Sequence, residues 1–256
     1  MKLTQHVNQG QLVYLSNTED QITINENSYY RWLAFDDVIQ SVMHLRCPAK
    51  LTLPHHYAVL MPLLFFKPEK VIELGLGGGN LSRFLSALQP GIDIISVELS
   101  QTVIDCFQGY FNPLKYAIKI EKNEALKWLQ QEHSSTTRAA DWLICDVYQH
   151  HAKSFQSRVN LLTALIENLQ ENGCLTINLP DLDDHEINLC LTILKQLQSS
   201  HHIIYFHIPR YLNVVIHLLP KHWLIDNLKK RSKKTYLSPT QYLRWKSFFS
   251  HYMNAN

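Results

Sequence analysis

The sequence has little that would place this 256-residue chain in a membrane or a secretory route. No stretch reaches the roughly 18 to 20 apolar residues needed to span a bilayer. The first residues, MKLTQHVNQG, hold a lysine but no apolar run after it, which argues against a secretory signal. With 46% hydrophobic and 18% charged residues, the composition is that of a globular protein. We therefore expect a cytoplasmic protein without membrane contact.

Cysteine is scarce and scattered, and no two cysteines form a C-x-x-C pair. Cys145 and Cys174 fall in apolar runs that indicate buried strands, so reduced core thiols are predicted rather than disulfides. The chain has 14 histidines, but none shows helical metal-ligand spacing beside an acid. We expect no metal site. The five cysteines are Cys47, Cys106, Cys145, Cys174 and Cys190.

The net charge of +2 conceals an uneven distribution. From Lys221 to the end the chain carries eight Lys and Arg and one acid, and five of these cations lie in 229–234. A solvated terminal segment is the favoured interpretation, and contact with nucleic acid, phosphate or another chain is the alternative. No aromatic residue interrupts the run to stack on bases. Residues 221–256 are expected to form a basic, helical C-terminal tail.

The first part of the chain favours β structure. Between residues 11 and about 46, the runs QLVYL, QITIN and YYRWLAF are separated by polar turns, which predicts a small antiparallel sheet in an N-terminal segment, 1–50. Residues 55–66 look helical and buried, with a break at Pro62.

From residue 70 onward, apolar strands alternate with helical stretches. This alternation is typical of βαβ units around a parallel sheet that is covered on both faces. Two closing strands with a short connection must run antiparallel to each other. We predict an α/β domain over 51–220, with a Rossmann-like, seven-stranded, mostly parallel sheet and one reversed strand. The predicted strands are VIELG, IDIISVEL, YAIKI, ADWLICD, CLTINLP, HIIYFHIP and NVVIHLL.

The turn after the first of these strands has the pattern of a nucleoside site. Gly75-Leu76-Gly77-Gly78-Gly79 follows the strand directly, and a helix opens at Asn80 or Leu81, with Asn80 as a candidate N-cap. Glu98 ends the next strand about 20 residues on, where an acid accepts hydrogen bonds from ribose hydroxyls. Asn123 follows the third strand, where its amide oxygen can accept from an adenine amino group.

Two other interpretations of this turn are weaker. A glycine-rich turn can simply pack a helix on a strand. A dinucleotide site requires G-x-G-x-x-G, but Asn80 stands where the third glycine belongs. The spacing therefore favours a nucleoside cofactor.

These residues resemble the spermidine synthase (polyamine aminopropyltransferase) family, a branch of the class I methyltransferase fold. Residues 33–40, LAFDDVIQ, look like the family's L-x-L-D-G-V-x-Q, and 75–79 look like its G-G-G-D-G loop. Asp146 matches the first aspartate of its D-S-S-D-P motif. The likeness covers roughly residues 11–220.

The resemblance implies roles for single residues. Asp146 would act as the catalytic base, Glu98 would bind the ribose, and Arg83 falls on an arginine common in the family. Glu73 before the loop favours an S-adenosyl cofactor, and His55 falls near the family's His or Gln before its P-L. The cofactor-binding set is thus Gln40, His55, Glu73, Gly75, Gly77, Gly78, Glu98 and Asn123, and the acceptor pocket would include Tyr148, Gln149 and His150.

The departures from the family pattern concern acids. Gly78 replaces the loop aspartate that pairs with the amine of decarboxylated S-adenosylmethionine, and Gln149 replaces the second aspartate of D-S-S-D-P. Both resemble a divergent bacterial branch labelled spermidine synthase-like. Loss of two acids predicts weak binding of putrescine, since a buried charge without its partner is costly. Bare backbone N–H groups at Gly78 would favour the carboxylate of intact S-adenosylmethionine.

Three functions remain open from the sequence. The first is transfer of an aminopropyl group from decarboxylated S-adenosylmethionine to an amine such as putrescine. The second is methyl transfer from S-adenosylmethionine to an unidentified acceptor, and the third is a cofactor-binding or interaction protein without turnover. For Asp146, a helix or turn cap is the alternative to a catalytic role. The resemblance also implies a homodimer.

Overall fold

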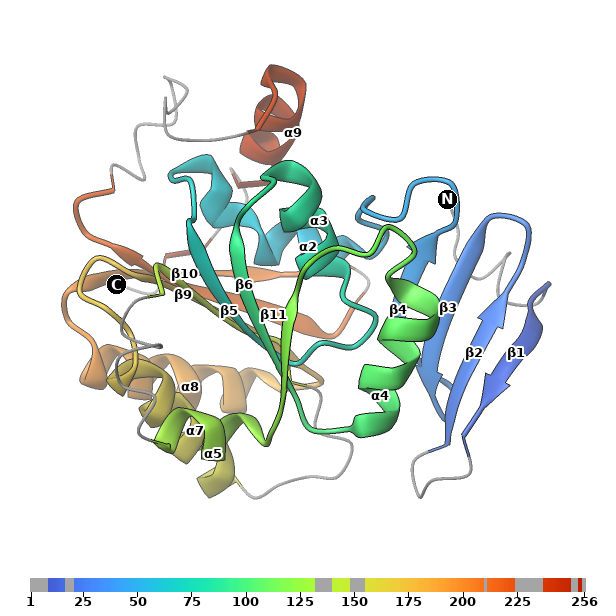
Figure 1. Cartoon of the computed structure of the whole chain (residues 1–256). Coiled ribbons are helices and arrows are strands. Elements are labelled where there is room, and N and C mark those ends of the chain that lie inside the picture. Colours follow the sequence, from blue (N-terminus) through green and yellow to red (C-terminus); the bar gives the residue numbers. More distant parts are fainter. Residues whose placement is uncertain are drawn as a thin grey trace.

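The computed structural model describes residues 9–16, 21–131, 140–147, 155–209, 211–223, 237–249 and 253–254. Two sheets stand side by side, a large one with helices on both faces and a small one near the N-terminus (Figure 1).

The large sheet confirms the predicted α/β fold. Its order is β12-β10-β11-β9-β8-β5-β6-β7, in which β5 to β9 run parallel and β11 runs antiparallel to both neighbours. The short β12, which pairs with β10, adds an eighth strand that the sequence did not predict. The strands are β5 (Lys70–Leu74), β6 (Asp93–Glu98), β7 (Lys119–Lys122), β8 (Trp142–Cys145), β9 (Cys174–Pro180), β10 (His201–His207), β11 (Asn213–Pro220) and β12 (Met253–Asn254).

Helices cover the two faces of this sheet (Figure 1). One face packs against α2 (Pro54–Val59), the 3₁₀ helix η1 (Met61–Leu64), α3 (Asn80–Leu88) and α9 (Pro239–Phe249). The other packs against α5 (Ala125–Gln130), α7 (Phe155–Glu167) and α8 (Asp184–Leu197). A further helix, α4 (Gln101–Cys106), continues into the π-helical turn η2 (Phe107–Phe111).

The helix predicted over 55–66 breaks as expected. Pro54 occupies its first turn, where the missing N–H costs nothing, and α2 ends at Val59. A 3₁₀ turn then carries Pro62, because proline cannot donate the next helical hydrogen bond.

The small sheet is antiparallel, as predicted, and is built from β1 (Gln11–Leu15), β2 (Ile22–Glu26), β3 (Tyr30–Phe35) and β4 (Val38–His44). One face forms an apolar core with α4 and η2, in which Ile24 and Leu33 meet Val103 and Phe107. Arg31 adds a hydrogen bond of 2.5 Å to the carbonyl of Tyr110. These contacts fix β4 beside the glycine-rich turn.

The cysteine prediction is confirmed. All five are free thiols, and Cys106, Cys145, Cys174 and Cys190 are buried. Burial raises the pKa of Cys145 to about 12, which keeps that thiol protonated and unreactive. Over the described ranges, no helix is long and apolar enough to cross a membrane.

Candidate nucleoside-binding site

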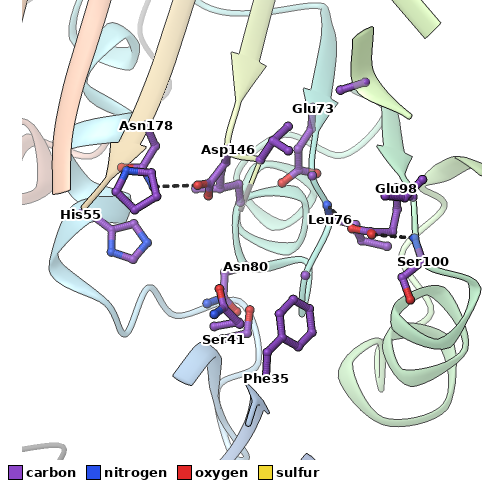
Figure 2. A pocket seen from close by; sticks show the side chains of 18 of the residues that line it. Phe35, Ser41, His55, Glu73, Leu76, Asn80, Glu98, Ser100, Asp146 and Asn178 are labelled. Atoms are coloured by element: carbon purple, nitrogen blue, oxygen red, sulfur yellow. Dashed lines mark hydrogen bonds between the residues drawn. The ribbon is translucent and has the colours of Figure 1, made fainter. Parts of the chain in front are cut away.

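A cavity of about 840 Å³ opens at the carboxyl ends of the parallel strands. Open α/β sheets bind ligands there, at the point where the strand order reverses. In this sheet that point is β5, because the chain proceeds outward to β6 and β7 and then returns to place β8 on the other side of β5. Side chains from β4, α2 and β9 close the cavity from the flanks (Figure 2).

The glycine-rich turn can exist only with glycine at two positions. Gly75 has a φ of 91°, and a Cβ there would lie 2.3 Å from the backbone oxygen of Asp146. Gly79 has a φ of 65°, and its Cβ would lie 2.3 Å from the ring of Phe107. Both values lie in the left-handed region that side chains disfavour. The turn therefore brings the backbone of β5 into close contact with the segment that follows β8.

Position 78 requires glycine for a different reason, which is its close contact with the small sheet. A Cβ at Gly78 would lie 2.7 Å from Cβ of Ser41, so the serine occupies the space of an aspartate side chain at this position. The Gly78 N–H donates to Oγ of Ser41 at 2.8 Å. The prediction of a bare N–H at Gly78 is therefore wrong. Gly78 also does not line the cavity, whereas Gly75 and Gly77 do.

The N-cap prediction for Asn80 is also wrong. Gly79 is the N-cap of α3, and Asn80 is the first helical residue. The amide oxygen of Asn80 accepts a hydrogen bond from the Arg83 guanidinium.

Arg83 is fully buried and stabilises the glycine-rich turn through hydrogen bonds. Its guanidinium also donates to the carbonyls of Pro48 at 2.9 Å, of Phe111 at 3.1 Å and of Gly78. Burial lowers the pKa of Arg83 to about 9. The Arg83 side chain thus connects three segments of the chain, which contain Pro48, Gly78 and Phe111.

Glu98 lies where a ribose-binding acid is expected. One carboxylate oxygen accepts from the N–H of Leu76 at 3.0 Å and the other from the N–H of Ser100 at 2.9 Å (Figure 2). A carboxylate has about four acceptor sites, so each oxygen retains one for a ligand hydroxyl. The two backbone donors fix the orientation of this side chain before any ligand binds.

Asn123 and Gln40 also line the cavity. The amide oxygen of Asn123 accepts from the N–H of Glu124 at 2.9 Å, and its amide nitrogen donates to Gln131 at 3.0 Å. Gln40 makes only a long contact of 3.5 Å to the carbonyl of Val38. The Asn123 side chain is therefore held in place, whereas that of Gln40 is held weakly.

Glu73 lines the cavity from β5, but its carboxylate is already bonded within the protein. It accepts from Ser96 at 2.6 Å and from Ser82. Burial raises its pKa to about 7, although both hydroxyls and Arg83 oppose the shift. A contact between Glu73 and a cofactor stays a prediction.

Asp146 follows β8 directly and faces the cavity (Figure 2). Its backbone N–H donates to the carbonyl of Leu74 at 2.8 Å. The amide of Asn178 donates to one carboxylate oxygen at 2.6 Å, and Asn213 in turn donates to Asn178 at 3.1 Å. Asp146 thus caps no helix in the described part of the chain, and two amides orient it.

His55 and His56 face Asp146 from the start of α2. A ring nitrogen of each and a carboxylate oxygen of Asp146 all lie within 4.8 Å of one another. The two rings meet edge to face with centroids 4.3 Å apart, and both Nδ1 atoms are buried without a hydrogen-bond partner among the described residues. Burial lowers the pKa of both imidazoles, so each is neutral near pH 7. Among the described residues, these three form the one group of histidine and acid side chains close enough together to be tested for a metal.

The predicted residues Tyr148, Gln149 and His150 lie outside the described residues, as does the basic run 229–234. Sequence reasoning assigned no role in the site to several residues that line it: Ser41, His56, Asp181, Asn178 and Asn213. The sequence does contain a feature that could have identified Asn178. It is a polar residue near the carboxyl end of an otherwise apolar parallel strand.

The lining of the cavity is acidic. Among the described residues that line it there is no lysine or arginine. Its carboxyl groups belong to Glu73, Glu98, Glu124, Asp146 and Asp181. Such a lining favours a cationic ligand.

No family model matches the chain. A curated relative, the polyamine aminopropyltransferase of Chromobacterium violaceum, is 30% identical over 93 residues. That match covers 36% of this chain and 36% of the relative, so it spans about a third of the relative's length.

Solved structures extend the likeness over most of the chain. A probable spermidine synthase from Corynebacterium glutamicum superposes with a TM-score of 0.69 at 16% identity, over 88% of this chain and 83% of that one. The chain has the spermidine synthase fold. A spermidine synthase in complex with the transition-state analogue AdoDATO, at 16% identity, gives 0.62 over 91% and 84%.

Methyltransferases share the same architecture at lower similarity. Human methyltransferase-like protein 13 in complex with SAH superposes with a TM-score of 0.54 at 17% identity, over 78% of this chain and 91% of that one. The spermidine synthase fold and the class I methyltransferase fold have the large sheet in common, which agrees with the predicted fold class.

Proposed function

We propose that this protein is a spermidine synthase-like transferase, which moves an aminopropyl group from decarboxylated S-adenosylmethionine to an amine. The observation that carries the proposal is one cavity with two oriented carboxylates. Glu98 and Asp146 enter it from the strands on either side of β5, and each is held by hydrogen bonds from the protein.

The proposed reaction is a displacement at the carbon next to a sulfonium. The amine nitrogen forms a bond to that carbon, the carbon–sulfur bond breaks, and sulfur keeps the electron pair as neutral methylthioadenosine. The residues would contribute by orientation and by removal of a proton from the attacking amine. Glu98 would hold the ribose, Asn123 would accept from the adenine amino group, and Asp146 would lie beside the amine.

The charge of the cavity supports a sulfonium donor with an amine acceptor. Both ligands are cationic, and no described lysine or arginine competes for the carboxylates of the lining. A spermidine synthase neighbour binds AdoDATO and a methyltransferase neighbour binds SAH, which are both S-adenosyl compounds.

Methyl transfer from intact S-adenosylmethionine is the second candidate. The observation that favours it is the pair Gly78 and Ser41, since a serine hydroxyl stands where the family's pattern has a carboxylate for the donor amine. The methyltransferase neighbour with SAH supports the same alternative.

One product analysis separates these functions. The protein would be incubated with each sulfonium donor and a panel of amines, and the nucleoside product identified by mass spectrometry. Methylthioadenosine supports aminopropyl transfer, whereas S-adenosylhomocysteine indicates methyl transfer, and neither product with any pair contradicts the proposal. Putrescine is expected to be a weak acceptor, because Gln149 replaces an acid of the family's pattern.

We also propose a cytoplasmic homodimer, on the basis of the resemblance. The exposed side chains Leu12, Val13 and Leu15 of the edge strand β1 support a contact between copies. Light scattering after size-exclusion chromatography measures the mass. A monomeric mass at micromolar concentration would contradict the dimer, and cell fractionation tests the location.

A further inference from the structure

We propose that His55 accepts the proton that the acceptor amine loses, and that Asp146 stabilises the imidazolium so formed. This inference rests on the proposed function, and it names the proton acceptor that the function requires. The resemblance assigned that task to Asp146 and gave His55 a place at the cofactor.

The first support is position. His55 lines the cavity, and a nitrogen of its ring is within 4.8 Å of a carboxylate oxygen of Asp146. Its Nδ1 is buried without a partner, whereas Nε2 is neither among the buried unpartnered atoms nor hydrogen-bonded to any described residue. Nε2 is therefore the atom through which the ring can exchange a proton with a ligand.

The second support is the role left to Asp146. Asn178 and Asn213 hold its carboxylate in one orientation, as a positioning group needs. An acid that is fixed beside an imidazole raises the proton affinity of that ring without taking the proton itself. The negative charge of Asp146 does act in this direction on the pKa of His55, against the larger effect of burial.

The third support is chemical matching. An alkyl ammonium ionises near pH 10, and an imidazole is ordinarily a stronger base than a carboxylate, so it is the better matched proton acceptor. The neutral ring takes one proton from the ammonium, and the free amine then attacks the carbon next to the sulfonium. The product leaves as a secondary ammonium, and the imidazolium releases its proton to solvent. One proton is released per turnover.

The charged and titratable groups around His55 have opposing effects. Asp146 at the end of β8 favours the imidazolium, and His56 lies against the His55 ring. Arg83 of α3 acts on His56, and Glu73 of β5 interacts with Arg83 and Asp146. Among the described residues, Asp146 is the charged group that acts directly on the pKa of His55, and it opposes the larger lowering by burial.

The test is the pH profile of kcat for the wild type, His55→Gln and Asp146→Asn, with methylthioadenosine as the measured product. We expect wild-type kcat to fall as the pH decreases through the pKa of His55, below about 6.5. In His55→Gln, kcat should fall about 10²- to 10⁴-fold, and the decrease of kcat at low pH, the acid limb of the profile, should disappear. In Asp146→Asn the limb should move to lower pH. His185→Gln, at an exposed histidine of α8, is the matched control and should keep the wild-type profile.

Two further measurements keep the inference separate from folding and from the proposed function. Imidazole in the buffer should restore part of kcat to His55→Ala, which a purely structural role would not allow. The NMR titration of His55 needs no turnover, so it decides the pairing even if no amine is a substrate. Its pKa should be lower in Asp146→Asn than in the wild type.

The inference is overturned by an unchanged acid limb in His55→Gln, by an identical pKa of His55 in both proteins, or by absence of imidazole rescue. It is also overturned if the chain binds one Zn²⁺ through His55, His56 and Asp146, since a nitrogen that is bound to metal cannot accept a proton. Metal analysis of the purified protein, with and without a chelator, measures that outcome.

Discussion

The two sides of the cavity differ in how their polar groups are satisfied. On the glycine side, which comprises 75–79, Glu98 and Asn123, almost every polar side chain is bonded to a backbone group of the protein. On the histidine side, which comprises His55, His56, Asp146, Asn178 and Asn213, two buried ring nitrogens have no partner. A side chain whose polar atoms are already bonded is held rigidly, whereas an unpartnered buried polar atom is costly and can take part in proton transfer.

The two sides also differ in how well their residues match the motifs of the spermidine synthase family. The glycine side keeps the turn and the acid at the end of β6, although Gly78, which packs against Ser41, replaces the loop acid. The histidine side keeps Asp146 and brings in a second histidine. The following variants test this division, from the largest expected effect to the smallest.

Asp146→Asn should separate catalysis from donor binding. The amide keeps the size of the side chain but removes its charge, so kcat should fall about 10²- to 10⁴-fold. Binding of methylthioadenosine, measured by calorimetry, should stay within about threefold of the wild type, since Glu98 and Asn123 are untouched. Asp184→Asn, at an exposed acid of α8, is the control. Equal loss of binding and turnover would remove the division between the two sides.

Glu73→Gln should change how stability depends on pH. The pKa of Glu73 is raised to about 7 in the folded protein, so the folded state favours the protonated form. The unfolded carboxyl ionises near 4.5, and the wild type should therefore lose stability as the pH rises from about 4.5 to 7, by about 3 kcal/mol at most. Urea unfolding at several pH values measures this slope. The Gln variant should show a flatter profile, and parallel profiles would contradict the account.

Glu98→Gln should weaken the binding of methylthioadenosine about 10- to 100-fold. Hydrogen bonds to a charged group contribute about 1.5 to 3 kcal/mol, and the amide can accept through only one atom. Calorimetry gives the Kd. Glu124→Gln changes another acid of the lining and should have a smaller effect. If the two variants lose equal affinity, Glu98 has no special contact with the ribose.

Gly78→Asp tests why the loop acid is absent. Because its Cβ would lie 2.7 Å from Cβ of Ser41, the single variant should lose about 1 to 3 kcal/mol of stability. The double variant with Ser41→Gly should recover part of this loss and bind decarboxylated S-adenosylmethionine more tightly than the wild type. Thermal unfolding and calorimetry measure the two effects. A single variant as stable as the wild type would show that Ser41 does not exclude the acid.

The fold could be predicted because its strands are apolar runs with clear boundaries. CLTINLP, for example, coincides with β9. The strand predicted at YAIKI instead forms at Lys119–Lys122, because β7 is an edge strand and tolerates charged residues on its open side. The two residues of β12 carry no pattern of their own, and only their pairing with β10 makes them a strand.

The site could be predicted only where one local segment defines it. Gly75 and Gly77 of the turn, Glu98 and Asp146 belong to motifs and line the cavity as expected, whereas Gly78 does not. Ser41, Asn178 and the four hydrogen bonds of Arg83 depend on contacts between distant segments, which no spacing records. The N-cap of α3 differs from the prediction because Gly79, in a left-handed conformation, takes the place expected for Asn80.

A crystal structure with methylthioadenosine bound tests the central claim most directly. We predict both ribose hydroxyls within hydrogen-bond distance of Glu98, the adenine beside Asn123, and the sulfur on the side of Asp146 and His55. A nucleoside bound elsewhere, or Glu98 turned away from the sugar, would contradict the account.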